Sequence, residues 1–294
     1  VYKRQALEGS ERMKKNVYTK EHLLYLASVR RKNIAVIFAR ALILFALLGI
    51  WELAARLNWV NPFVTSSPSR VAKTLGELYR AGTLFYHIGV TLSETLIGFF
   101  IAVAGGYVLA LLLWWSDGVR RTAEPYLVVI NALPKIALGP LVIIWFGTGK
   151  EAIICMTVLV GIIVATMNML GGFMETDENK LLLLRSLGAD KMQILLKLVV
   201  PSSLPAFISM LKISVGMAWI GSIMGEYIVS KAGIGYLIVY GGQVFKLDLV
   251  MASVFVLCVL AAGMYAVVAT LEKIVVKSVS YTHLRAHETS AHLV

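Results

Sequence analysis

Six long apolar runs limit most strongly what this chain can fold into. A helix needs roughly 20 apolar residues to cross about 30 Å of hydrocarbon. The chain has 294 residues, is 58% hydrophobic and has a mean hydropathy of +0.77, whereas about half of the residues in soluble domains are apolar. Membrane β-strands alternate apolar and polar residues over segments of about ten, a pattern that these runs lack. We therefore predict an all-α, polytopic membrane helix bundle with six transmembrane helices, at residues 34–54, 88–115, 124–147, 152–172, 206–229 and 249–271.

The distribution of Lys and Arg predicts the orientation of these spans. Basic flanks stay on the cytoplasmic side of a membrane. With the N-terminus inside, the cytoplasmic segments hold 17 basic residues and the opposite loops hold 7. We therefore expect both termini in the cytoplasm. Basic flanks on anionic lipid head groups account for the net charge of +11, so we expect the lipid bilayer as a partner and no nucleic acid.

One membrane domain, residues 34–277, follows a cytoplasmic segment of residues 1–33. Residues 1–5 and 280–294 resemble translated sequencing adaptor, which carries no fold information. His283 and His287 have a spacing that can bind zinc on a helix. Because they lie in this tail, we expect no metal site there.

A short helix is predicted after the first span. Ser67 can cap a helix whose first residue is Pro68, and apolar side chains recur on one face over residues 69–86. This helix lies either along the outer membrane surface or packed on the bundle.

Small residues predict close contacts between spans. Ala102, Gly106 and Ala110 recur every four residues, as do Gly221 and Gly225, and such spacing lets helix backbones approach closely. These seams lie within the subunit or between two copies. In the third span, which we expect to begin at Pro125, Pro134 predicts a kink.

Several motifs fail on inspection. The segment Gly147–Lys150 is similar to the end of a phosphate-binding loop. That pattern requires glycine where this chain has Ile144, and Ser or Thr where it has Glu151, so the segment does not match. Gly233 and Gly235 lack the third glycine of a dinucleotide fingerprint. The sequence contains no convincing Ser/His/Asp or Cys/His set. We therefore expect a non-catalytic chain that binds no metal and no cofactor, with any ATP and magnesium held by a partner.

A moderately polar segment, residues 175–201, separates the fourth and fifth runs. Acidic residues at 175, 177 and 178 favour a helix start, Gly188 breaks the apolar pattern, and Pro201 and Pro205 end it. A short helix, a glycine turn and a second helix would form a rigid knob. Such a loop can pass mechanical work from a soluble partner to the spans, which points to a transporter with an external motor.

This segment resembles the EAA loop of binding-protein-dependent ABC importer permeases, whose pattern is E-A-A-x3-G-x9-I-x-L-P. With the glycine on Gly188, the Glu and both Ala fall on Leu182, Leu183 and Leu184, the Ile on Leu198, and the L-P on Val200 and Pro201. The glycine and the proline match.

The surrounding sequence is similar to the nitrate, sulfonate and taurine branch of these permeases, which have a type I importer fold. The similar segments are Ser66–Ser69, Ala132–Pro134, Leu138–Leu141, Ile144–Gly147, Arg185–Ala189, Val200–Pro201, Leu204–Pro205, Ala218–Trp219, Gly225–Glu226 and Gly233–Tyr236.

The resemblance implies that the spans lie in a prokaryotic plasma membrane, that two ABC ATPase subunits bind the loop, and that an extracytoplasmic solute-binding protein delivers the cargo. It also implies that a second permease chain pairs with this one, for which we expect a homodimer and leave a heterodimer open. The coupling residues it implies are Leu182, Leu183, Leu184, Arg185, Gly188, Ala189, Lys191 and Pro201.

Polar residues inside the spans are candidates for a translocation pathway, because such groups face protein or water. They are Glu94, Lys135, Lys212, Ser214, Trp219, Ser222 and Glu226. The alternative is helix packing with snorkelling side chains. The two lysines suit an anion such as nitrate or a sulfonate, whereas Glu226 does not, so a related small metabolite stays open as the cargo.

Two other functions stay open. A secondary transporter driven by an ion gradient would have inverted repeats and broken spans around an ion site, and would work without an ATPase. A membrane scaffold would transport nothing.

Overall fold

The computed structural model describes residues 20–291, with side chains described from Ile34 to Ile274 and at a few positions before Ile34. Residues 1–5, set apart above, lie outside this range. Within it every regular element is helical, which confirms the all-α prediction. The helical backbone also continues through residues 280–291.

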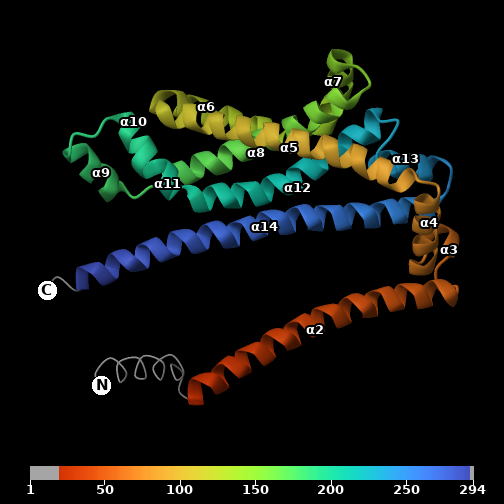
Figure 1. The fold of residues 1–294 in the computed structure, drawn as a ribbon. Helices are drawn as coiled ribbons and strands as arrows, with labels where there is room; N and C mark the ends of the chain where they lie inside the picture. Colours follow the sequence, from red (N-terminus) through yellow and green to blue (C-terminus); the bar gives the residue numbers. More distant parts are fainter. Residues whose placement is uncertain (1–19, 292–294) are drawn as a thin grey trace. The chain divides into compact units, whose positions relative to one another are not determined.

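Five single helices and one bent pair are long and apolar enough to cross a membrane (Figure 1). If the bent pair is one span, the predicted count of six is confirmed. The single helices are α2 (Lys20–Arg56), α5 (Thr83–Trp115), α8 (Lys150–Met174), α12 (Leu204–Val229) and α14 (Leu247–Ala291). The pair joins α6 (Asp117–Ala132) to η1 (Lys135–Leu138) and α7 (Gly139–Phe146). Shorter helices are α3 (Pro62–Thr65), α4 (Pro68–Arg80), α9 (Glu178–Ser186), α10 (Lys191–Ile194), the π-helical turn η2 (Leu195–Val199), α11 (Val200–Ser202) and α13 (Ile234–Gln243).

The described residues divide into two compact units, one that ends at Ser69 and one that begins at Arg70. In the first, Glu52 of α2 accepts hydrogen bonds from the backbone N–H of Ser69 and from its hydroxyl, both at 3.0 Å. The N–H of Ser69 belongs to the first turn of α4, where donors have no partner within the helix. Glu52 therefore caps the helix that begins, as predicted, at Pro68.

Helix α4 ends earlier than predicted. Gly82 has a φ of +71°, which favours glycine, and α5 begins at Thr83, so residues 81–86 do not belong to α4. In the second unit Val71 is buried, and Leu75 and Leu78 pack against a cluster that includes Ile234 and Leu237. Of the two arrangements considered for this helix, the structure shows packing on the bundle.

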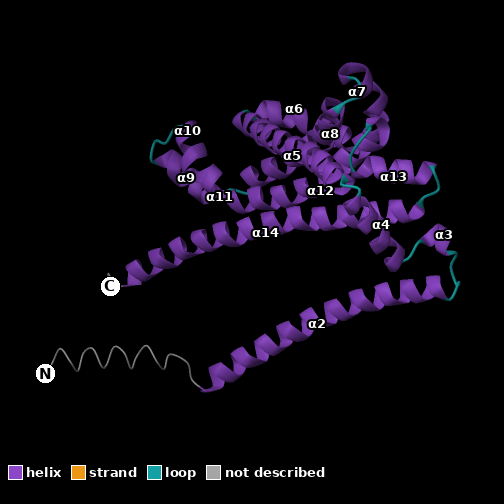
Figure 2. Cartoon of the chain, turned by 45° about the vertical axis from the view of Figure 1, so that its right-hand side comes forward, coloured by secondary structure: helices purple, strands orange, loops and turns teal. Residues whose placement is uncertain are grey.

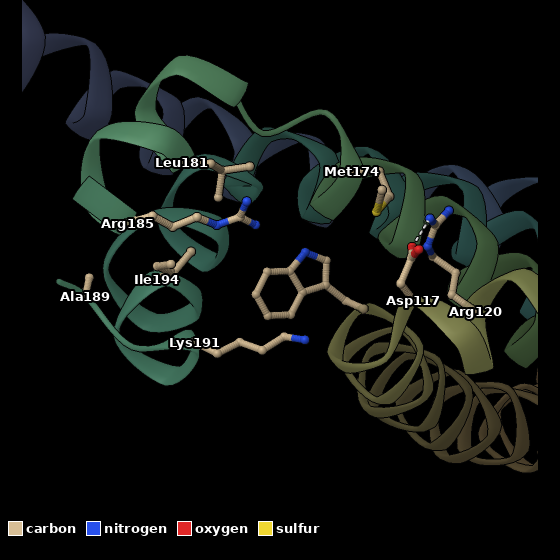
Figure 3. A pocket seen from close by; sticks show the side chains of 9 residues that line it. Asp117, Arg120, Met174, Leu181, Arg185, Ala189, Lys191 and Ile194 are labelled. Atoms are coloured by element: carbon tan, nitrogen blue, oxygen red, sulfur yellow. Dashed lines mark hydrogen bonds and ion pairs between the residues drawn. The ribbon is translucent and has the colours of Figure 1, made fainter. Parts of the chain in front are cut away.

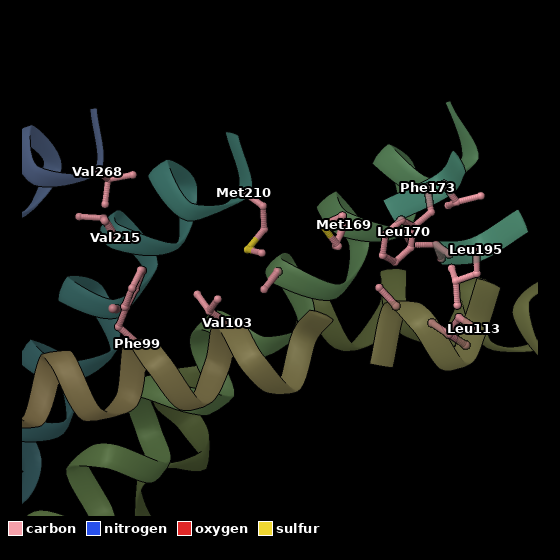
Figure 4. Close-up of a cluster of buried hydrophobic side chains, with 14 of the residues drawn as sticks. Phe99, Val103, Leu113, Met169, Leu170, Phe173, Leu195, Met210, Val215 and Val268 are labelled. Carbon is pink, nitrogen blue, oxygen red and sulfur yellow. The ribbon is translucent and has the colours of Figure 1, made fainter. Parts of the chain in front are cut away.

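The core of the second unit lies between α5, α8 and α12, which run side by side, with α14 along α12 and α13 (Figures 1 and 2). Its buried side chains form one continuous cluster (Figure 4). The cluster includes Phe99, Val103 and Leu113 of α5, Met169, Leu170 and Phe173 of α8, Met210 and Val215 of α12, Val268 of α14 and Leu195 of η2.

Glycines make the closest helix contacts. A Cβ on Gly106 of α5 would lie 2.5 Å from the Cβ of Ala165, and a Cβ on Gly221 of α12 would lie 2.6 Å from the Cα of Thr157. A Cβ on Gly225 would meet the Cα of Ile153 at 3.0 Å. The predicted seams are confirmed, and they lie within the chain, where α5 and α12 both press on α8.

The third span was predicted wrongly at its start. Residues 116–123, expected as a loop, begin α6, and Pro125 lies inside that helix. Ser116 caps the helix by accepting from the N–H of Val119, and Arg120 pairs with Asp117 and Glu124. These contacts stabilise the first two turns although Pro125 donates no hydrogen bond. The kink predicted at Pro134 is confirmed, since the two arms meet at a bend of 86°.

We predict that Gly221→Ala lowers the stability of the helix bundle by about 1–3 kcal/mol, because the added methyl group forces α12 away from the backbone of α8. Thermal unfolding of the purified chain in detergent measures the change. Gly216→Ala is the matched control on the same helix, because a Cβ there meets nothing within 4 Å. Equal midpoints for the two variants would contradict the seam.

Candidate functional site

The polar segment folds into two short helices joined at Gly188. Helix α9 ends where the N–H of Ala189 donates to the carbonyl of Leu184 (2.9 Å) and the N–H of Gly188 donates to that of Arg185 (3.0 Å). This is the Schellman pattern, whose left-handed residue is usually glycine, and Gly188 has a φ of +78°. The glycine break predicted from the sequence is confirmed.

The second helix begins with a reciprocal cap. The carboxylate of Asp190 accepts from the N–H of Gln193 (2.7 Å), and the Gln193 side chain accepts from the N–H of Asp190 (3.1 Å). A capping box of this kind satisfies two donors that a helix start otherwise leaves unpaired. The direction in which the chain leaves Gly188 is therefore fixed.

Pro201 does not end this helix, contrary to prediction. The chain stays helical from Lys191 to Ser202 through the π-helical turn η2, and α12 starts at Leu204 with Pro205 as its second residue. A proline ring clashes with the carbonyl four residues earlier in a regular α-helix. The wider turn of η2 directly before Pro201 changes that geometry.

The two arms of this elbow, residues 178–202, have different surroundings. Ile194, Leu195 and Val199 are buried in the same core as α5, α8 and α12. On α9, Leu184 packs partly against that core, whereas Leu182 and Leu183 are 57% and 60% exposed. Leu187, next to the turn, is 72% exposed. The elbow thus has a buried root and an apolar outer face of Leu182, Leu183 and Leu187.

Lys191 adds a second attachment. Its ammonium group donates to the carbonyl of Trp115, the last residue of α5, and lies 5.7 Å and 5.4 Å from the ring centroids of Trp114 and Trp115. An ammonium over an indole face is attracted by the ring. The start of α10 is therefore held to the end of α5.

A second group of predicted residues forms a buried polar cluster where α5, α12 and α13 meet. Ser222 of α12 accepts a hydrogen bond from Thr95 of α5 at 2.8 Å, and both are fully buried. Glu94 and Glu226 are 3% and 2% exposed, and their carboxyl groups interact with each other. Next to Glu94 in sequence, Ser93 accepts a hydrogen bond of 3.1 Å from Lys150.

Glu226 caps α13 from another helix. Its carboxyl oxygen accepts from the N–H groups of Gly235 (2.6 Å) and Tyr236 (3.3 Å). Thr91 accepts from the N–H of Ile234 (2.7 Å), and the imidazole of His87 accepts from that of Gly233 (3.0 Å). Helix starts attract such acceptors because their N–H groups are unpaired. Any Cβ on Gly233 would overlap the Glu226 carboxyl group, so only glycine fits.

The structure brings together some of the predicted pathway residues and separates others. Ser214, Trp219, Ser222 and Glu226 are buried on α12, and Glu94 is buried on α5. Lys212 forms an ion pair of 2.6 Å with Glu272 of α14. Lys135 lies at the bend after α6, where it donates to the carbonyl of Asn131 at 2.9 Å.

Helix α13 and its caps were missed from the sequence. The region 230–248 was expected as a loop, and Gly233 and Gly235 were set aside as a failed nucleotide motif. The turn residues at 230–233 followed by the apolar residues Ile234, Leu237 and Ile238 were the available signal for a helix start. His87 gave no such signal, because its role depends on a contact between distant segments. Within the described residues no group of three or more His, Cys, Asp or Glu side chains could hold a metal ion.

The sequence pattern of the family described as "binding-protein-dependent transport system inner membrane component" matches residues 95–281. A probable ABC transporter permease of Haemophilus influenzae is 33% identical, over 76% of this chain and 91% of that protein. This chain belongs to that family.

Other permeases match over similar lengths. The formylaminopyrimidine transport permease ThiX of Halalkalibacterium halodurans is 32% identical, over 78% of this chain and 90% of that protein. The taurine permease TauC of Escherichia coli is 26% identical, over 74% and 81%. Permeases named for aliphatic sulfonates and for nitrate also match. The predicted family, a binding-protein-dependent ABC permease, is therefore confirmed.

The fold also matches solved importers. The permease in an inward-facing structure of the MetNI methionine ABC transporter has a TM-score of 0.59 at 19% identity, over 66% of this chain and 96% of that one. The chain is thus a multi-pass permease of an ABC importer, whose family works with an ATPase and a solute-binding protein. These matches do not support the alternative of a secondary transporter.

We predict that Glu226→Ala raises the amide hydrogen exchange rate of Gly235 and Tyr236 by about fivefold or more, because a buried donor left without its acceptor costs about 1–3 kcal/mol. Glu226→Gln keeps one acceptor oxygen and should show a smaller increase. Exchange measured by mass spectrometry on peptides spanning α13 reports both. Unchanged exchange in the alanine variant would show that the cap contributes nothing.

Proposed function

We propose that this permease is the non-catalytic, membrane-spanning part of an importer in which two partner ATPase subunits bind and hydrolyse ATP with magnesium. A second copy of the chain completes the membrane part, and an extracytoplasmic binding protein delivers the solute. The observation that carries the proposal is the two-sided elbow, with its exposed apolar face on α9 and its root in the bundle core.

The elbow has the properties that a mechanical coupling element requires. An ATPase groove that covers Leu182, Leu183 and Leu187 would gain the hydrophobic free energy of three side chains. Leu184, Gly188, Ala189 and Lys191 then keep the outer face in a fixed relation to the bundle. Because packed interiors deform little, a displacement of α9 moves Ile194, Leu195 and Val199 together with α5, α8 and α12.

We place the elbow and both termini in the cytoplasm. The basic residues support this orientation, since 17 lie on the side of the elbow and 7 on the other. The position of Gly147 and Gly149 argues against a nucleotide-binding site in this chain, because Gly147 follows α7 and Gly149 precedes α8. They join two helices, whereas a phosphate loop follows a strand.

We place the translocation pathway beside the bend at Pro134. Irregular backbone within a membrane is tolerated only where it is buried in protein or lines a cavity with water. The apolar side chains of Leu133, Ile136 and Leu141, on both sides of Lys135, are exposed. We propose that a second copy of the chain covers them. The buried Glu94, Ser214, Trp219, Ser222 and Glu226 then support the wall of the pathway, and Lys212 is fixed to α14 by Glu272.

The cargo we propose is a small anion of the nitrate, sulfonate and taurine type or a related small metabolite. The relatives named for taurine, aliphatic sulfonates and nitrate support the anion. The one named for formylaminopyrimidine supports the wider class. Lys135 at the bend is the cation placed to meet an anion.

We predict that Leu183→Asp weakens capture of the ATPase subunit by at least about tenfold, because an apolar contact worth about 1.5–3 kcal/mol is replaced by a charge. Co-purification of tagged permease with its ATPase measures capture. Asn179→Asp adds the same charge to an exposed position of α9 without removing apolar surface. Equal capture by both variants would reject the docking face.

We predict that Lys135→Gln lowers the rate of uptake by the assembled transporter about tenfold, while the amount of assembled complex is unchanged. The lost interaction is one charge-assisted contact with an anion, worth about 1.5–3 kcal/mol. Uptake is measured with the solute that the cognate binding protein retains. Lys246→Gln, at an exposed position between α13 and α14, is the control. An unaffected uptake rate in Lys135→Gln would remove this residue from the pathway.

A further inference from the structure

A cavity of about 450 Å³ lies at the root of the elbow, between the ends of α5 and α8, the start of α6, and helices α9 and α10. Its polar wall consists of Asp117, Arg120, Arg185 and Lys191 (Figure 3). The side chain of Trp114 also lines it. The side chains of Arg185 and Lys191 both extend from the elbow into the cavity (Figure 3), and the ammonium group of Lys191 lies 5.7 Å from the centroid of the Trp114 ring. The cavity therefore joins cations from one element to an aromatic side chain from another.

The cavity carries an excess of positive charge. Arg120 is compensated by Asp117 and Glu124. Among the described residues, no side chain forms an ion pair or a hydrogen bond with the guanidinium of Arg185. The ammonium group of Lys191 donates to the carbonyl of Trp115, and within the same residues it has no carboxylate partner. Two cations that converge without a counter-ion favour an anionic ligand.

The rest of the wall is apolar. Met174, Leu181 and Ile194 line the cavity beside Trp114. The volume is within the range of small-molecule sites, about 300–1,000 Å³. A ligand that matches both walls has a phosphate group for Arg185 and Lys191 and an apolar portion for the remaining surface.

The position of the cavity indicates the source of such a ligand. Trp114 and Trp115 are the last residues of the span α5, and tryptophan is enriched where membrane meets water. On the side to which the basic residues assign the elbow, the leaflet is rich in anionic lipids. A phospholipid head group therefore lies at the same depth as the cavity.

We propose that this cavity is a binding site for a phosphate ester anion, supplied by the head group of an anionic phospholipid, with Arg185 and Lys191 as its ligands. An occupied site joins α9 and α10 to the end of α5 through the ligand, in addition to the contact between Lys191 and Trp115. The site is distinct from the transport pathway, and its ligand needs neither the ATPase nor the solute.

The test measures lipid binding to the full-length permease alone, so that a failure of ATPase docking does not affect it. Native mass spectrometry in detergent follows titration with phosphatidylglycerol and, separately, with phosphatidylcholine. The double variant Arg185→Gln/Lys191→Gln should weaken phosphatidylglycerol binding roughly 25-fold, at about fivefold for each cation removed. The matched control is Lys180→Gln/Lys197→Gln, which removes two exposed cations of the same segment that do not line the cavity.

Competition with inorganic phosphate distinguishes the two sources of the anion. Selective binding of phosphatidylglycerol that only Arg185→Gln/Lys191→Gln weakens supports the lipid. Binding of inorganic phosphate that depends on the same pair, without retention of phosphatidylglycerol, supports the phosphate site and assigns a soluble source. Equal binding of both lipids together with no bound phosphate, or equal losses in the two double variants, would overturn the proposal.

Discussion

The packing of Ile194, Leu195 and Val199 into the core of α5, α8 and α12 is the contact on which the rest of the structure depends. These three side chains come from the elbow, yet they are buried with residues of three spans. Apolar burial stabilises by about 25 cal/mol per Å², and here it fixes a segment that is otherwise at the surface. Without this root, α9 would be a tethered helix whose position had no consequence for the spans.

The spans can respond to the elbow because they are themselves closely packed. Gly221 and Gly225 bring α12 against the backbone of α8, and Gly106 does the same for α5. Lipid supplies no hydrophobic drive between helices, so close van der Waals contact at small residues holds them together. At the other end of the bundle, Glu226 fixes the start of α13. Both ends of α12 are thus tied to neighbouring segments.

Much of this architecture follows from local sequence patterns. The apolar runs, the bend at Pro134 and the turn at Gly188 each depend on residues adjacent in the chain, and each was predicted. The early start of α6 was missed because Pro125 gave a strong signal for a helix start, while Ser116 and the ion pairs of Arg120 outweigh it. The capping of α13 depends on contacts among residues 87, 91 and 226, which no local pattern encodes. For the same reason, Ser214, Ser222 and Glu226 were recognised as polar residues inside a span, but their burial was visible only in the fold.

Site-directed labelling of Leu187→Cys, in a chain with Cys155 and Cys258 replaced by alanine, tests the central claim most directly. Leu187 is the most exposed residue of the apolar outer face. A membrane-impermeant maleimide should label it in inside-out vesicles and not in intact cells, and assembly with the ATPase subunits should suppress the labelling. Labelling from outside intact cells, or labelling that the ATPase leaves unchanged, would contradict the account of a cytoplasmic elbow that receives the motor.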